Sequence, residues 1–439
     1  MKYSSLKQIL KNLYVGLKAV ATGQNEHSFY FQTMNLTDSI KAIKYSLMNI
    51  VGVRVNRNSR ERFLGEVKRL FNYRAAFLFG SGRSAIYSLL SSMELSKESE
   101  VIVTGYTCDV VPNAVIQAGL NPVYVDIDPA HYCMSPTSVL SKITDQTKVI
   151  ILQHSYGLTT DVEAILKFAH DHSLYVIEDC AVSLGSKHSG KLTGSFGDAA
   201  IFSFELSKTI TSGRGGMLLL NTDSMNSISK VTEYYNKNVP EQKYLYRIKT
   251  LFQLGASGFL YRPRIMPAGK FIIALMFKLK IFSYSTSLDE KLGRMPADYI
   301  CKLSSEQAKI LTRQWQRLPQ ILGISRTNID WYLKKLRNHI SPEQFKKLSN
   351  PEVNLIRFPI QISKRAEFLQ NHEAFPVEIG QWFTAPISDT DTDQLAFQYE
   401  IGYCPVSEKV CSEIINLPLN IELNEDVRNR IILGIINYV

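Results

Sequence analysis

The sequence predicts an α/β fold, with a large domain whose mostly parallel sheet is covered by helices and a smaller C-terminal α/β domain. Short, continuous apolar segments alternate with amphipathic segments over residues 61–222. Such unbroken apolar strands are typical of a parallel sheet that is buried on both faces. After about residue 301, helical patterns are followed by mixed helix and strand patterns, which indicates the second domain.

The elements of the large domain can be predicted in chain order, because each apolar run ends at a turn or runs into a helix. "AAFLFGSG" is a strand that enters a glycine turn, and "RSAIYSLLSSM" is the helix after it. The expected strands span residues 75–82, 100–107, 121–128, 147–157, 174–181, 198–205 and 215–222, and the expected helices span residues 83–93, 111–120, 136–144 and 161–173.

Polar residues follow several of these strands. Ligands of parallel sheets bind beyond the carboxyl ends of the strands, so we expect the functional site there. The residues at or near such ends are Gly80 to Gly82, Tyr106, His154, Asp179 and Lys208.

The chain divides into four expected regions. A basic helical extension covers residues 1–60, and the large domain covers 61–230. A basic, apolar insertion or linker covers 231–300, and the small C-terminal domain covers 301–439.

Composition limits the classes of partner. The 439-residue chain is 45% hydrophobic and 21% charged, as in ordinary globular proteins, and its net charge of +10 favours anionic partners. Lys and Arg residues are spread along the chain, and zinc-finger, RNA-recognition and basic-zipper motifs are absent from the sequence. We therefore expect no nucleic-acid partner.

The six cysteines form no CxxC pair, so we expect no metal site. Cysteines in apolar surroundings indicate buried, reduced thiols and a cytoplasmic protein. The N-terminus is basic but lacks the apolar core and cleavage site of a signal peptide.

Two ionisable residues stand out in the apolar strands and turns. Lys208 lies between the apolar segment that ends near Ser203 and the glycine-rich turn "GRGG". Taken alone, this fragment favours a solvated turn lysine. Asp179 ends a buried strand, where a carboxylate needs a partner to offset its loss of hydration.

Three further features have both structural and functional interpretations. "GSGRS" opens a helix, whose backbone amides suit a phosphate, although a lone glycine-rich turn is weak evidence. His154 is either a catalytic group or, as we favour, a buried histidine with satisfied hydrogen bonds. Asp126 and Asp128 resemble a carboxylate pair, but a turn at a strand end is the favoured interpretation.

Several motifs in order resemble the DegT/StrS group of sugar aminotransferases, which are pyridoxal-phosphate (PLP) enzymes of fold type I. Each motif is weak alone, but the ordered set is specific. The motifs are "GSGRSAIYSLL", "VIVTGYT", "AGLNPVYVDIDP", "HSYGLTTDVEAI", "YVIEDCA", "GSFGDAAIFSFELSK", "GRGGML", "GRMPADYICKLSSEQAKI" and "GYCPVSEKVCSEIINLPL".

The resemblance implies roles for individual residues. Lys208, five residues after Ser203, would join its neutral amine to the PLP aldehyde and then act as base and acid in the proton shift. Asp179 would hold a proton on the pyridine nitrogen, which makes the ring an electron sink. The other implied cofactor contacts are Ala181 beneath the ring, and Gly82, Arg83, Ser84 and the Ser203 hydroxyl around the phosphate.

Three positions depart from the family pattern. Val182 stands where His or Gln is usual, and Cys108 stands where an aromatic residue often stacks on the ring, with Tyr106 the nearest aromatic. Lys302 aligns with a neighbouring-subunit Asn that reaches the phosphate. The lysine at position 208 argues against the related dehydratases, which carry histidine there.

The resemblance implies an aminotransferase that converts a nucleotide-diphosphate keto-sugar to an amino sugar for surface polysaccharide, with glutamate as amino donor and a homodimer as the active form. The alternatives are another PLP reaction, amination of a cyclitol or lipid-linked sugar, or a non-catalytic regulator on the same fold.

Two basic, apolar segments raise the question of whether the protein contacts a membrane surface. Residues 5–20 place Leu6, Ile9, Leu10, Leu13 and Leu17 on one helical face, and "KFIIALMFKLKIF" (270–282) is too short to span a bilayer. The favoured interpretation is that one segment packs on the dimer and the other in the core. The alternative is peripheral contact with the inner face of the cytoplasmic membrane.

Overall fold

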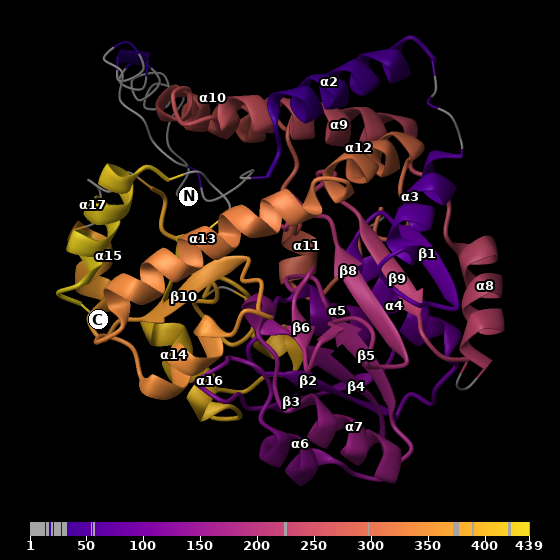
Figure 1. The fold of residues 1–439 in the computed structure, drawn as a ribbon. Helices are drawn as coiled ribbons and strands as arrows, with labels where there is room; N and C mark the ends of the chain where they lie inside the picture. The colour runs from indigo at the N-terminus through magenta and orange to yellow at the C-terminus, as the bar shows by residue number, and fades with distance from the viewer. Residues whose placement is uncertain are drawn as a thin grey trace.

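The computed structural model describes most of the chain from residue 33 onward (Figure 1). The helix expected at residues 5–20 lies mainly outside the described residues. Those described are 14, 17, 18, 21, 28, 33–53, 55, 58–223, 226–296, 298–371, 377–388, 390–419 and 423–438.

The large domain contains the predicted sheet, and all seven predicted strands form it. One strand runs antiparallel to both of its neighbours, and the other neighbouring pairs are parallel. In spatial order the strands are β1 (Ala75–Phe79), β9 (Gly216–Leu220), β8 (Ala199–Ser203), β5 (Tyr175–Asp179), β4 (Thr147–Gln153), β2 (Glu100–Thr104) and β3 (Asn121–Val125), β9 being the reversed one.

Helices cover both faces of this sheet, so its strands are apolar on both sides. On one face Val101, Ile151 and Leu218 pack with α4 and α5, and on the other Ile150, Leu152 and Val176 pack with α6 and α7. The helices of this part are α3 (Ser59–Lys68), α4 (Gly82–Ser92), α5 (Val110–Gln117), α6 (Pro136–Lys142), α7 (Val162–Asp171) and α8 (Ser227–Asn238), with the hairpin β6 (Lys187–His188) and β7 (Lys191–Leu192).

A second core lies in the C-terminal part, where two antiparallel strands pack against helices (Figure 1). Its centre contains Tyr332, Phe358 and Ile415, all buried. The elements are β10 (Arg357–Gln361), β11 (Ile414–Pro418), α13 (Leu318–Leu336), α14 (Pro342–Ser349), α15 (Arg365–Asn371), α16 (Pro405–Glu413), α17 (Glu425–Ile435) and the short helix η4 (Leu395–Phe397). A further short helix, η1 (Ser155–Gly157), follows β4 in the large domain.

The N-terminal extension and the insertion come together as one helical layer, which lies at the top of Figure 1. In α2, Asp38 is buried and pairs with Arg313 and Arg317. Gly255 of α9 allows the two helices to approach closely, because a Cβ there would lie 2.6 Å from Ile43. The elements of this layer are α2 (Leu36–Ile50), α9 (Tyr244–Leu260) and α10 (Met266–Lys278). The short helix α11 (Leu288–Lys291) and helix α12 (Ser305–Trp315) follow in the chain, and α12 packs against α2 and α3.

Among the described residues, none of the helices has both the length and the apolar character needed to cross a bilayer.

Candidate active site

The turn after β8 carries Lys208 and is fixed by hydrogen bonds on both sides. The amide of Phe204 donates to the carbonyl of Gly215 (2.8 Å), and the amide of Ser212 donates to the carbonyl of Phe204 (3.0 Å). Gln314 of α12 bonds both the amide and the carbonyl of Thr211. The backbone around Lys208 is therefore held by the sheet and by a neighbouring helix.

Lys208 is partly buried rather than exposed on the turn. Its ammonium lies 5.2 Å from the centre of the Trp382 ring. Burial lowers the pKa of Lys208; the charge of Arg357 adds to this, while Glu205, Cys108 and Asp179 oppose it. These surroundings favour a neutral amine, which is the form that reacts with carbonyl groups.

Asp179 ends β5 and is 5% exposed. Its Oδ1 accepts a hydrogen bond from the amide of Ala181 (3.0 Å). Burial raises the pKa of Asp179, while the amide of Ala181 and the charges of Lys208 and His154 lower it. An acid and an amine that influence each other thus lie at the ends of adjacent strands.

Behind Asp179, Glu178 and His154 form a buried pair. The carboxylate of Glu178 accepts three backbone amides, from Gly194 (2.8 Å), Phe196 (2.6 Å) and Gly197 (2.8 Å). His154 Nε2 lies 2.9 Å from the same carboxylate. This arrangement fits the favoured interpretation of His154 as a buried structural residue, although its Nδ1 has no partner among the described residues.

Ligand atoms of His154, Glu178 and Cys180 lie within 4.8 Å of one another, which is close enough to consider a metal ion. However, the oxygens of Glu178 are already bonded to backbone amides. The group is therefore better explained as a support for the 194–197 turn.

The first turn of α4 forms a polar cradle against β8 and β9. The Ser81 side chain caps the helix by accepting the amide of Ser84. The amides of Gly82 and Arg83 are the next donors, and a helix start provides them no internal acceptor. A Cβ on Gly82 would lie 3.4 Å from Ser203 Cβ, so the helix start and the Ser203 side chain are neighbours. Such a cradle suits a phosphate.

The side chains of Arg83 and Ser84 point to a different segment. The guanidinium of Arg83 pairs with Glu290 and donates to the carbonyl of Ser285 (2.5 Å). The hydroxyl of Ser84 donates to the carbonyl of Tyr299 (2.5 Å). These contacts tie residues 285–299 to α4, so the cradle is built from backbone amides and not from the Arg83 charge.

Tyr106 is completely buried in an aromatic cluster. Its hydroxyl lies 2.6 Å from that of Tyr156 and donates to the carbonyl of Trp382 (2.9 Å). The Phe383 ring packs edge-on against it. Tyr106 thereby positions the segment that carries Trp382.

Burial raises the pKa of the Cys108 thiol to about 12, while the charge of Lys208 acts to lower it. Its sulfur donates to Asp109 Oδ1 (3.2 Å). Ala181 and Val182 follow Asp179 and are partly buried. The backbone of Lys302 pairs with Phe79, at the end of the strand that leads into the cradle, and its ammonium is 4.7 Å from the Tyr235 ring.

Sequence reasoning missed Trp382 and Arg357. The guanidinium of Arg357 lies over the same Trp382 ring that faces Lys208. Arg357 comes from β10, and Trp382 lies between β10 and β11, so the C-terminal part completes the surroundings of Lys208. Neither residue occurs in a motif that predicts this.

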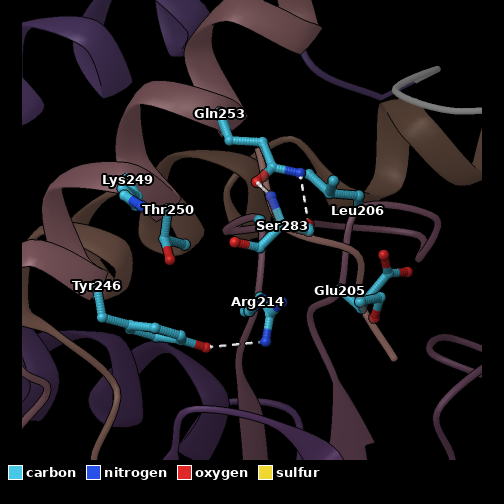
Figure 2. Close-up of a pocket in the computed structure, with 10 residues that line it drawn as sticks. Glu205, Leu206, Arg214, Tyr246, Lys249, Thr250, Gln253 and Ser283 are labelled. Carbon is cyan, nitrogen blue, oxygen red and sulfur yellow. Dashed lines mark hydrogen bonds between the residues drawn. The ribbon is translucent and has the colours of Figure 1, made fainter. Parts of the chain in front are cut away.

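Two cavities adjoin the site. One, of about 330 Å³, is lined by Gly80, Ser81 and Arg83 of the cradle and by Arg214, Tyr246 and Glu290, among others. Figure 2 shows the second, of about 30 Å³, where the hydroxyl of Tyr246 meets Arg214 (3.2 Å) and Gln253 bonds Ser283. The insertion therefore lines the space beside the Lys208 turn.

Comparison with known proteins relates the whole arrangement to one family. The sequence profile of the DegT/DnrJ/EryC1/StrS aminotransferase family matches residues 50–264 and 271–435. GDP-perosamine synthase of Escherichia coli O157:H7 is 41% identical over 145 residues, which cover 33% of this chain and 40% of that protein. The pleiotropic regulatory protein of Geobacillus stearothermophilus is 35% identical over 200 residues, covering 44% of this chain and 54% of that protein.

These alignments span only about half of each curated relative or less. Among solved structures, the aminotransferase PseC of Helicobacter pylori, involved in pseudaminic acid biosynthesis, has a TM-score of 0.68 at 17% identity. That match covers 90% of this chain and 95% of PseC. At this identity the likeness supports the fold, and it confirms the predicted fold type.

Proposed function

Because this chain belongs to the DegT/DnrJ/EryC1/StrS aminotransferase family, we propose that it is a PLP-dependent aminotransferase that converts the keto group of a nucleotide-diphosphate-linked sugar to an amine. The observation that carries the proposal is the meeting of Lys208, Asp179 and the α4 cradle at one edge of the sheet. Glutamate is the proposed amino donor and a homodimer the proposed active form.

The described residues fit PLP. The α4 amides and the Ser203 hydroxyl suit its phosphate, and the cradle is kept open by glycine, since a Cβ on Gly216 would lie within 2.5 Å of the Gly82 amide nitrogen. Asp179 is a buried acid whose cost of burial a protonated ring nitrogen would offset. Lys208 is an amine with a lowered pKa.

When bound, PLP supplies an aldehyde for a lysine amine and a conjugated ring that takes up negative charge from the reacting carbon. In the proposed reaction Lys208 Nζ would remove a proton from the carbon that bears the amine and would return it to the carbon on the other side of the nitrogen, which is a 1,3-shift. Asp179 would hold a proton on the ring nitrogen. Burial favours the neutral amine of Lys208, and the Trp382 ring lies on one side of it.

The large cavity next to the cradle supports a phosphorylated substrate. Arg214 lines it, whereas Arg83 is already paired with Glu290, and the chain carries a net charge of +10. The name of the related GDP-perosamine synthase indicates a nucleotide sugar. We therefore propose a nucleotide-linked keto-sugar ahead of a cyclitol or a lipid-linked sugar.

A test begins with the purified chain and added PLP. A visible absorption band that shifts on addition of glutamate, together with borohydride trapping of PLP on the Lys208 peptide, would support the aminotransferase. A panel of nucleotide-linked keto-sugars and a cyclitol ketone would then identify the acceptor by mass spectrometry. A chain that neither binds PLP nor consumes glutamate would instead support the regulator, the class suggested by the name of the Geobacillus relative.

We further propose that the protein is cytoplasmic and contacts the inner face of the cytoplasmic membrane, where surface polysaccharide is assembled. The support is the basic, apolar character of residues 5–20 and 270–282. Binding of the chain to anionic vesicles at low salt would test this contact.

A further inference from the structure

Helix α2 is more polar on its buried side than on its exposed side. The buried side contains Asp38, Ser39, Ala42, Tyr45, Ser46 and Asn49. The large apolar residues face outward: Leu36, Ile40, Leu47 and Ile50 are 43%, 56%, 57% and 56% exposed. A helix on the surface of a water-soluble domain normally has the opposite pattern.

The small and polar residues of α2 pack against α9. This packing explains the inner face of α2 but not its apolar outer face. Ser39 and Ile43 contact the position of Gly255 in α9, and the Ser46 hydroxyl donates to the carbonyl of Ile248 (3.0 Å). Close packing of the two helices thus requires small residues inward. Leu47 and Ile40 are instead 57% and 56% exposed.

The exposed apolar surface extends onto the neighbouring helices. Leu245 and Phe259 of α9 are 68% and 45% exposed, and Leu279 directly after α10 is 58% exposed. Figure 1 shows α2 packed along α9 at the top of the molecule, with α10 next to α9, apart from the sheet. We call the residues 36–50 and 243–284 the basic apolar layer. Large exposed apolar areas on a single chain mark interaction surfaces.

The same layer contains almost all of the net charge of the protein. Its two segments contain ten Lys and Arg residues and a single acidic residue, Asp38, whereas the whole chain has a net charge of +10. Asp38 is buried and paired with Arg313 and Arg317. Lys and Arg residues occur along the whole chain, and the excess of positive charge in this layer arises because acidic residues are almost missing from it.

A surface that is apolar, basic and free of exposed acids is complementary to a bilayer with anionic headgroups. A second copy of the chain is the main alternative, since Leu36, Ile40, Ile43, Leu47 and Ile50 have heptad spacing. Charge argues against it, because two such layers would bring like charges together. A coiled-coil contact along α2 alone would also leave the exposed apolar residues of α9 uncovered.

We propose that the basic apolar layer docks on an anionic membrane surface, with the outer face of α2 entering the headgroup region. This inference rests on the proposed membrane contact and assigns it to a particular surface. Docking would also orient the candidate active site, because Tyr246 and Gln253 of α9 line the cavity beside the Lys208 turn.

The experiment uses the full chain and vesicles of phosphatidylcholine with or without phosphatidylglycerol, at low and high salt. We expect co-sedimentation with the anionic vesicles at low salt and little with the neutral ones. The double variant Ile40→Gln/Leu47→Gln should bind the anionic vesicles at least about tenfold more weakly than the parent chain. Leu433→Gln, which alters a residue 70% exposed on α17, is the matched control and should bind as the parent does.

Each outcome decides between the alternatives, provided that circular dichroism shows both variants folded. If the parent chain binds no vesicles, both the membrane contact and this surface are wrong. If the double variant binds as well as the parent, the contact exists but another segment, such as residues 5–20, makes it. If the double variant instead converts a dimer to a monomer, as measured by light scattering, the face joins two copies and the proposal is overturned.

Discussion

The ammonium nitrogen of Lys208 lies 5.2 Å from the centre of the Trp382 ring, and this contact joins the two parts of the chain. Lys208 follows a strand of the large sheet, whereas Trp382 lies between β10 and β11. The Tyr106 hydroxyl fixes the Trp382 segment by donating to its carbonyl. The surroundings that lower the pKa of the lysine therefore depend on how the C-terminal part packs.

Replacing Lys208 with Ala should abolish borohydride-stable attachment of PLP and reduce amino transfer by roughly 10²- to 10⁴-fold or more, since a positioned proton-transfer group contributes about that factor. Fold and phosphate binding should remain, because the cradle uses the α4 amides and Ser203. The measurements are peptide mass spectrometry after reduction and a steady-state assay with glutamate.

Lys208→Arg is the control for charge, because arginine keeps a cation near Trp382 but cannot be deprotonated in a protein. It should be as inactive as the alanine variant. Full transfer activity in either variant would show that another amine does the chemistry.

The reactivity of Lys208 should depend on pH in a way that reports its burial. Burial lowers the pKa of Lys208 below 10.5, so the neutral amine is present at lower pH than in an unfolded chain. Labelling with an amine-reactive reagent across a pH series should give a midpoint for the Lys208 peptide that lies below the midpoint of the same peptide in urea. Coincident midpoints would mean that the folded protein does not activate this lysine.

Much of this site could be predicted because its parts are local in sequence. Lys208, Asp179 and the Gly82 turn each follow a strand, and the parallel order brings strand ends to one edge. The strands themselves were confirmed by the structure, since continuous apolar runs are a strong signal. Trp382 and Arg357 were not predictable, because their position depends on a long connection without periodic pattern.

The role of Arg83 shows a second limit. An arginine at a helix start next to a glycine turn suggests a positive charge for a phosphate. The sequence supports that interpretation and a solvated arginine equally well. The structure pairs the guanidinium with Glu290, which lies about two hundred residues further along the chain. A contact of that range leaves no signal in either segment alone. That Arg83, Ser84 and Lys302 contact the cofactor stays a prediction.

Replacing Asp179 with Asn should separate stability from activity. Burial raises the pKa of Asp179 in the folded chain, so its carboxyl stabilises the fold below the unfolded pKa of about 3.9. That stabilisation is lost as pH rises through the folded pKa. Asn keeps an oxygen for the Ala181 amide and carries no charge. The PLP-free variant should therefore unfold at the same temperature as the parent or higher at neutral pH.

Amino transfer by the same variant should fall by about 10²-fold or more, because the proton on the ring nitrogen loses its ionised partner. Thermal unfolding without PLP and the glutamate assay are the two measurements. A variant that loses stability and activity together would assign Asp179 a structural role instead.

Gly216 should be indispensable for the cradle, whereas Gly65 should not. A Cβ at Gly216 would lie within 2.5 Å of the Gly82 amide nitrogen and closer still to Ser81, so Gly216→Ala must displace the first turn of α4. We expect a loss of about 1–3 kcal/mol in the free energy of unfolding, typical of overpacking, and weaker binding of PLP.

Gly65 lies in α3 with nothing within 4 Å of its Cβ position, so Gly65→Ala should stabilise the chain by about 0.5–1 kcal/mol. Urea unfolding and PLP titration of both variants test this. Unchanged PLP affinity in Gly216→Ala would place the phosphate site away from the start of α4.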